Sequence, residues 1–139
     1  MTTSFDLLGA HISAEPITAP DIATAETGAV VVFDGIVRNH DSGRGVKLLT
    51  YTAHPSAQEE IERVAADVAA AFPAVRLWCA HRTGALEIGE SAFIVAAASA
   101  HRKDAFEAAS TCADRVKAEV PIWKEQSHGD GSTNWVGLE

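Results

Sequence analysis

The stretch DRVKAEVPIWKE, at residues 114–125, organises the rest of this chain. It ends an amphipathic helix, because Pro121 disfavours helical backbone for the residue before it, Val120. Lys117 stands in the last helical turn and Lys124 just beyond the break. On one continuous helix, two lysines seven residues apart would lie about 10 Å apart along the axis. With the break between them, the chain can turn and bring both ammonium groups to one anionic ligand. The alternative is that both lysines are solvated surface residues.

Length and composition predict one domain, spanning residues 1–139, with a single core. The net charge is -8, which argues against a protein that grips nucleic-acid phosphates. The sequence contains no run of 18 apolar residues, so no membrane-spanning helix is predicted, and the N-terminus lacks the pattern of a signal peptide. Cys79 and Cys112 stand in apolar surroundings without ligand spacing, which indicates small core residues in a reduced, cytoplasmic compartment.

Hydrophobic periodicity predicts two long helices and several strands. The valine-rich run at 29–38 should be a buried strand paired with 46–53, and Gly35 inside it indicates a bulge or a close backbone approach. Asp21 is a plausible N-cap for a short helix that ends before Gly28. Further strands are expected at 4–13, 75–82, 91–99 and 122–125, a turn-bounded segment at 84–89, a loop at 39–45, and the long helices at 55–72 and from about 101 to 119.

Strands in pairs, interrupted by two long helices, predict an α+β sandwich in which the helices pack on one face of a mostly antiparallel sheet. Cations gather at two further element ends. Arg38 stands at a strand end, and His101 and Arg102 stand where a strand meets a helix. A helix N-terminus already carries partial positive charge, so added cations there favour a bound anion. The alternative is an exposed first turn without a ligand.

Familiar catalytic and ligand-binding patterns do not occur in this sequence. It has no nucleophile elbow, no phosphate-binding glycine loop and no dinucleotide fingerprint. Its six histidines, His81 among them, lack metal-ligand spacing and are interpreted as scattered surface or structural residues. We therefore expect neither a metal site nor a bound cofactor.

Four motifs follow one another in a fixed order: VVFDGIVRNHDSG at 31–43, HRTGALEIGE at 81–90, SAHRKDAFEA at 99–108 and VKAEVPIWKE at 116–125, followed by Trp135-Val136. The combination of SAHR, a helix containing phenylalanine, and a final K-x-x-x-P-x-W-K is highly specific. In this order the motifs resemble one known family, the large, catalytic subunit of molybdopterin synthase. The likeness covers most of the chain from about Gly28 onward.

This resemblance implies an α/β hammerhead-like fold with a small additional β subdomain. It also implies a homodimer within a heterotetramer. In that family, each large subunit receives the C-terminal Gly-Gly tail of a small ubiquitin-like sulfur-carrier subunit, whose thiocarboxylate donates sulfur. The acceptor is cyclic pyranopterin monophosphate, and two transfers build the dithiolene of molybdopterin.

By the same resemblance, Lys117 and Lys124 match the catalytic lysines. Arg38, His101 and Arg102 match residues that hold the substrate. We predict that Lys117 stabilises developing negative charge or moves protons, and that Lys124 grips the tail or the substrate. Two other hypotheses remain at this point: a non-catalytic anion-binding regulatory module that uses the same cations, and a structural dimer whose exposed strands serve assembly alone.

Overall fold

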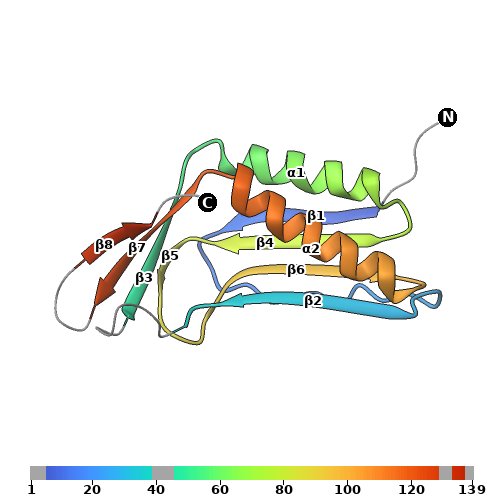
Figure 1. The fold of residues 1–139 in the computed structure, drawn as a ribbon, viewed down its shortest axis with the longest axis horizontal. Helices are drawn as coiled ribbons and strands as arrows, with labels where there is room; N and C mark the ends of the chain where they lie inside the picture. Colours follow the sequence, from blue (N-terminus) through green and yellow to red (C-terminus); the bar gives the residue numbers. More distant parts are fainter. Residues whose placement is uncertain (1–5, 39–45, 129–132, 137–139) are drawn as a thin grey trace.

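The computed structural model describes residues 6–38, 46–128 and 133–136, whose backbone forms two sheets and two helices (Figure 1). The first sheet has the strand order β1-β4-β6-β2, and the second has the order β5-β3-β7-β8. The first sheet consists of β1 (Asp6–Ser13), β4 (Arg76–Arg82), β6 (Ser91–Ser99) and β2 (Ala29–Ile36), and the second of β5 (Gly84–Leu86), β3 (Val46–Ala53), β7 (Ile122–His128) and β8 (Thr133–Val136).

Helices α1 (Ala57–Ala71) and α2 (Arg102–Glu119) lie side by side on one face of the first sheet (Figure 1). The apolar stripe of α1, which includes Ile61, Val64 and Val68, is fully buried against this sheet. Alanines dominate the buried face of α2, so its backbone approaches β6 and β2 closely. Cys79 and Cys112 are both buried in this core, as their apolar context predicted.

Strand pairing confirms the predicted α+β class and the mostly antiparallel sheet. Only the β1–β4 pair is parallel among the strands of the described residues. The β2–β6 register shifts between Gly35 and Ile36, which confirms the predicted irregularity at Gly35. A Cβ on Gly35 would lie 3.3 Å from the Phe93 carbonyl oxygen, so the backbones approach closely there. Among the described residues, neither helix is long and apolar enough to cross a membrane.

Two predictions about β2 are wrong. It is not a buried strand, because it forms an edge of the first sheet and leaves Val30, Val32 and Ile36 47%, 49% and 52% exposed. Nor does it pair with β3, which instead pairs with β5 and β7 in the second sheet. A run of β-branched residues indicates a strand, but it does not specify the neighbours of that strand.

The short helix predicted at 21–27 is also wrong, since that segment contains only a turn. The Asp21 carboxylate accepts a hydrogen bond from the Ala23 N–H at 3.2 Å, and the Thr27 hydroxyl accepts one from the Thr24 N–H at 2.9 Å. These side chains satisfy the backbone in place of a helix, as short polar residues often do. Ile22 is buried against Ala96 and Ala98 of β6, which fixes the segment to the second face of the sheet.

The break at Pro121 confirms the expected end of α2. Val120 has extended backbone angles (φ -89°, ψ 124°), so the helix stops there. The Pro121 carbonyl then accepts a hydrogen bond from the His54 N–H at 3.0 Å, and β7 continues antiparallel to β3. The proline therefore redirects the chain from the helical layer into the second sheet. The loop predicted at 39–45 and the first residues of the strand predicted at 4–13 lie outside the described residues.

Candidate active site

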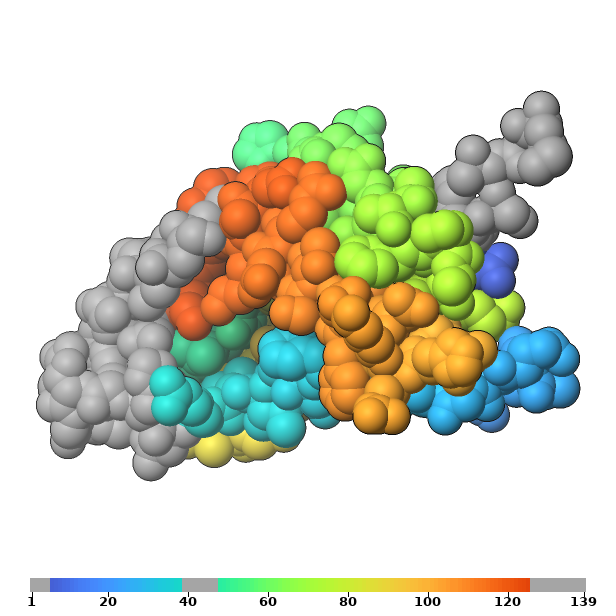
Figure 2. Space-filling model, turned by 45° about the vertical axis from the view of Figure 1, so that its right-hand side comes forward, coloured from blue at the N-terminus to red at the C-terminus, as the bar shows by residue number. Residues whose placement is uncertain are grey.

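A cavity of about 230 Å³ opens where the two sheets meet the C-terminal end of α2. Lys117 of α2 and Lys124 of β7 both line it, although seven residues separate them in the sequence. Figure 2 shows the surface hollowed between the cyan atoms of β2 and the orange-red atoms at the end of α2. The break at Pro121 thus brings the two lysines to one cavity.

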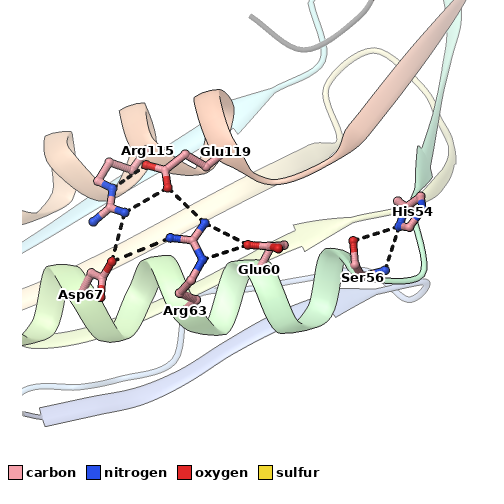
Figure 3. Close-up of polar contacts among 7 residues, drawn as sticks. All are labelled: His54, Ser56, Glu60, Arg63, Asp67, Arg115 and Glu119. Atoms are coloured by element: carbon pink, nitrogen blue, oxygen red, sulfur yellow. Dashed lines mark hydrogen bonds and ion pairs between the residues drawn. The ribbon is translucent and has the colours of Figure 1, made fainter.

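Lys117 belongs to a helical turn that ion pairs tie to α1 (Figure 3). Glu119 accepts hydrogen bonds from Arg115 on its own helix, at 2.6 Å, and from Arg63 on α1, at 3.1 Å. Arg115 also pairs with Asp67 of α1 at 3.1 Å. A single exposed ion pair contributes little to stability. Here Glu119 and Arg115 each have two partners, and the combined contacts limit how the end of α2 moves. This network therefore holds the backbone that carries Lys117.

Four rings form a continuous row along the cavity, each contributed by a different strand. Phe33 of β2 meets Phe93 of β6 edge-on at 5.9 Å between ring centroids. His81 of β4 stacks on Phe93 at 5.4 Å, and Tyr51 of β3 meets His81 edge-on at 5.1 Å. All four rings line the cavity together with Trp123. The site therefore combines cations with an aromatic lining, which suits a ligand that has both an anionic part and an aromatic part.

His81 is a site residue that sequence reasoning missed. Its Nδ1 lies 2.9 Å from the Arg82 carbonyl oxygen. The pKa of His81 is lowered to about 4, chiefly by burial; the backbone hydrogen bond opposes this shift, and the nearby charges of Lys117 and Lys124 add to it. The imidazole is therefore neutral at pH 7. Its position in the HRTG segment is the only sequence signal that sets it apart from the other histidines.

Tyr51 is a second cavity residue that the sequence did not mark as functional. Burial raises the pKa of its phenol above the ordinary value, so the side chain stays protonated at neutral pH. Its strand neighbour across β3 and β7 is Lys124. The end of the cavity next to the second sheet therefore holds a neutral hydroxyl beside an ammonium group.

The other predicted site residues, Arg38, His101 and Arg102, do not line this cavity. His101 and Arg102 are exposed and line a separate, open hollow at the N-terminal end of α2, with Lys103 and Phe106. Arg102 and Lys117 stand 15 residues apart on one helix, which corresponds to about 22 Å along its axis. Within one chain, the expected single cationic site therefore does not form. The hollow is the place where Gly28 passes so close to Ala100 that a Cβ would lie 2.2 Å from its carbonyl oxygen.

Arg38 follows two residues after Ile36, which lines the cavity, but its own exposed side chain does not. Val37 between them is fixed by hydrogen bonds with the loop after β5, to the Glu90 carbonyl at 3.0 Å and from the Gly89 N–H at 2.8 Å. Arg38 is therefore anchored near the cavity entrance by its backbone. Among the described residues, no group of three or more His, Cys, Asp or Glu side chains is arranged to hold a metal ion.

Comparison with known proteins gives the family. The model of the MoaE protein family matches residues 10–119. The chain belongs to the MoaE family. A molybdopterin synthase catalytic subunit from Nostoc sp. is 40% identical over 137 residues, which cover 97% of this chain and 82% of the relative. One from Mycobacterium tuberculosis is 35% identical, covering 91% of this chain and 89% of the relative.

Solved structures of MoaE-like proteins have the same fold. The crystal structure of molybdopterin synthase from Staphylococcus aureus superposes with a TM-score of 0.85 and 33% identity, covering 92% of this chain and 96% of that one. A complex of subunits 1 and 2 of the molybdopterin-converting factor from Helicobacter pylori matches with a TM-score of 0.63 and 25% identity, over 82% of this chain and 73% of that one. The family, fold class and sulfur-transferring enzyme class expected from the sequence are confirmed.

Proposed function

We propose that this MoaE-family chain is the catalytic subunit of a molybdopterin synthase and works in the cytoplasm as one domain. In this proposal, the cavity of Lys117 and Lys124 moves sulfur from the thiocarboxylate tail of a small ubiquitin-like subunit to cyclic pyranopterin monophosphate. The observation that carries the proposal is the convergence of two lysines on one aromatic-walled cavity in a protein of net charge -8. A structural dimer that served assembly alone would not need such a cationic cavity.

The cavity suits the chemistry of both reactants. A Gly-Gly tail has no side chains, so its end enters a cavity of about 230 Å³ that would exclude a bulkier terminus. The thiocarboxylate is an anion, and after it gives up its sulfur it becomes a carboxylate whose new oxygen comes from water. The lysines therefore face an anion before and after each transfer, and each favours the bound state.

The pterin part of the acceptor is a flat heterocycle, and aromatic side chains line the same cavity as the two lysines. Phe33 at one end of the row is 40% exposed, and Trp123 across the cavity is 38% exposed. Exposed aromatic rings that line a cavity supply binding area with little loss of side-chain entropy. We assign these rings to the pterin and the cations to the phosphate and the tail.

Lys117 and Lys124 occupy different surroundings, which supports separate roles. Lys117 is exposed on the last turn of α2 and lines the cavity from the helical side. Lys124 is half-buried in the second sheet beside Tyr51. We assign Lys117 to charge stabilisation or proton movement during transfer and Lys124 to holding the tail or the substrate. Preorganised cations of this kind stabilise charge that develops in a transition state.

Arg38, His101 and Arg102 are assigned to substrate binding, and a second copy of the chain supplies the latter two. His101 and Arg102 lie too far from Lys117 within one chain to hold the same small molecule. The edge strand β2 and the start of α2 expose apolar side chains, including Val32, Ile36 and Phe106. A homodimer that covers such surface brings the α2 N-terminus of one subunit toward the cavity of the other.

Reconstitution tests this function. Purified chain, a thiocarboxylated small subunit and cyclic pyranopterin monophosphate are combined, and product with two sulfurs is measured. Lys117→Met should lower the rate on the order of 100-fold or more, as removal of a transition-state charge partner does. Glu26→Gln, an exposed change outside both the cavity and the hollow, is the matched control. Near-normal turnover by Lys117→Met contradicts the mechanism, and phosphate binding without any turnover by the wild type would favour the non-catalytic module.

A further inference from the structure

His81 occupies the centre of the ring row and is the only imidazole that lines the cavity among the described residues. It stacks on Phe93 with 22° between the ring planes, and Tyr51 contacts it in an edge-on arrangement with 66° between the planes. Two rings from two different strands therefore fix the plane of the imidazole. A side chain held in this way keeps its ring nitrogens in constant positions relative to a molecule bound in the cavity.

The hydrogen bond to the Arg82 carbonyl decides the tautomer. A carbonyl oxygen only accepts, so Nδ1 must carry the proton and donate it across the 2.9 Å contact. In a neutral imidazole the other nitrogen, Nε2, then bears a lone pair. Nδ1 is directed to the backbone of its own strand, which leaves the Nε2 edge for a molecule in the cavity. His81 thus offers an acceptor where the lysines offer only donors.

Burial keeps His81 unprotonated, and the charged groups that face it add to this effect. Lys117 approaches from α2 and Lys124 from β7, and both oppose a positive charge on the ring. The remaining neighbours are the protonated phenol of Tyr51 on β3 and the apolar Phe93 on β6, while Arg82 on the same strand is paired with Glu90 at 3.0 Å. No carboxylate is among the described residues that line the cavity. An anion bound between the lysines offsets their charge and makes the imidazole more basic.

We propose that His81 is the general base of the sulfur transfer, acting through Nε2 on the water that releases the spent tail. This step rests on the proposed function. After the tail sulfur has bonded to the substrate carbon, a thioester joins the two molecules. Water adds its oxygen to the acyl carbon while one of its protons passes to Nε2. The carbon–sulfur bond of the acyl group then breaks, sulfur leaves with the electron pair as a substrate thiolate, and the tail leaves as a carboxylic acid that ionises in solvent.

The two lysines and His81 therefore have different roles in the transfer. Before anions bind, burial and, to a smaller extent, the two ammonium groups keep His81 neutral and weakly basic. The negative charges of tail and substrate arrive between them and raise its basicity at the moment when water must be deprotonated. A general base works best when its pKa is near the operating pH, so this rise in basicity favours the deprotonation of water.

The first test needs no turnover. Imidazole nitrogens are observed by NMR in the wild-type chain across pH, with and without inorganic phosphate as the anionic probe. We expect protonated Nδ1 and bare Nε2 for His81, and a pKa near 4 that rises when phosphate binds. A proton on Nε2, or a pKa that phosphate leaves unchanged, overturns the proposal. His81→Phe identifies the signal.

The second test uses the reconstituted enzyme with the small subunit. His81→Phe keeps the aromatic stack, and His81→Asn keeps a donor for the Arg82 carbonyl, but neither has a base. Both should lose about 100-fold in kcat, with KM for the tail nearly unchanged, and accumulate the covalent tail–substrate adduct seen by mass spectrometry. Unchanged kcat in a folded variant overturns the role of His81. Failure of the wild type to transfer any sulfur refutes the proposed function instead, while the NMR test still decides the tautomer and its response to anions.

Discussion

Tyr51 of β3 and Lys124 of β7 are direct antiparallel partners in the second sheet. Side chains of such a pair point to the same face, with Cβ atoms about 5 Å apart. Tyr51 also contacts His81 of the first sheet, at 5.1 Å between ring centroids. The pairing of β3 with β7 therefore places Lys124 beside Tyr51, which in turn contacts His81 of the first sheet.

Lys124→Met should raise the pKa of His81, because the ammonium of Lys124 is one of the charges that lower it. The same variant should raise KM for the thiocarboxylated small subunit, since one of the two cations facing the tail is gone. NMR titration measures the first effect and steady-state kinetics the second. Glu26→Gln, which changes an exposed side chain outside both the cavity and the hollow, is the control and should leave the pKa of His81 in place. An unchanged His81 titration in Lys124→Met would contradict the geometry of the cavity.

A subunit-mixing experiment tests whether the site is shared between two copies. Lys117→Met and Arg102→Ala should each be nearly inactive alone. Mixed dimers, purified through two different tags, contain one site with both residues intact and should recover about half of the wild-type rate. If Arg102 acts in its own chain, both sites of the mixed dimer are defective and no activity returns. Dimers of two differently tagged Lys117→Met chains contain no intact site and are the control without recovery.

The ion-pair network behind Lys117 should make stability depend on pH. Contacts with Arg115, and then with Arg63, lower the pKa of Glu119 from 4.5 to about 2 in the folded chain. Its stabilisation is therefore fully present above about pH 4.5 and is lost as pH falls toward 2. Glu119→Gln should flatten the fall in Tm across this interval, measured by thermal unfolding.

The matched control for this network is Glu26→Gln, since Glu26 makes no ion pair in the part of the chain that the structure describes. It should keep the acid dependence of the wild type. A Tm curve for Glu119→Gln that parallels the wild type between pH 4.5 and 2 would show that the network does not stabilise the fold.

Local patterns predicted most elements of the fold but not their neighbours. The stripe of Ile61, Val64 and Val68 is periodic enough to identify α1, and Pro121 ends α2 wherever it packs. The valines of β2 looked like a buried strand because apolar β-branched residues suit a core. These valines are exposed because β2 is an edge strand. Its edge position depends on its pairing with β6 and on the absence, among the described residues, of a further strand beyond it in the first sheet. Pairing of this kind joins distant residues and leaves no periodic signal in either segment.

The candidate site divides in the same way. Lys117 and Lys124 were found from the sequence, because a proline between two lysines has a local steric consequence. His81 was not, because nothing in its own segment shows that Phe93, Tyr51 and both lysines surround it. Its neutral state is a product of burial and of charges contributed by other elements.

The amino-acid sequence by itself determined the family, the two long helices, the break at Pro121 and the identity of the cationic residues, since each follows from motif order, periodicity or proline geometry. The tertiary structure alone decided that Lys117 and Lys124 share a cavity while His101 and Arg102 lie at the far end of α2. It alone also gave His81 its tautomer and its neutral charge. Distances across a sheet and the charge of a half-buried group are set by which segments pack together, and packing is a property of the whole chain.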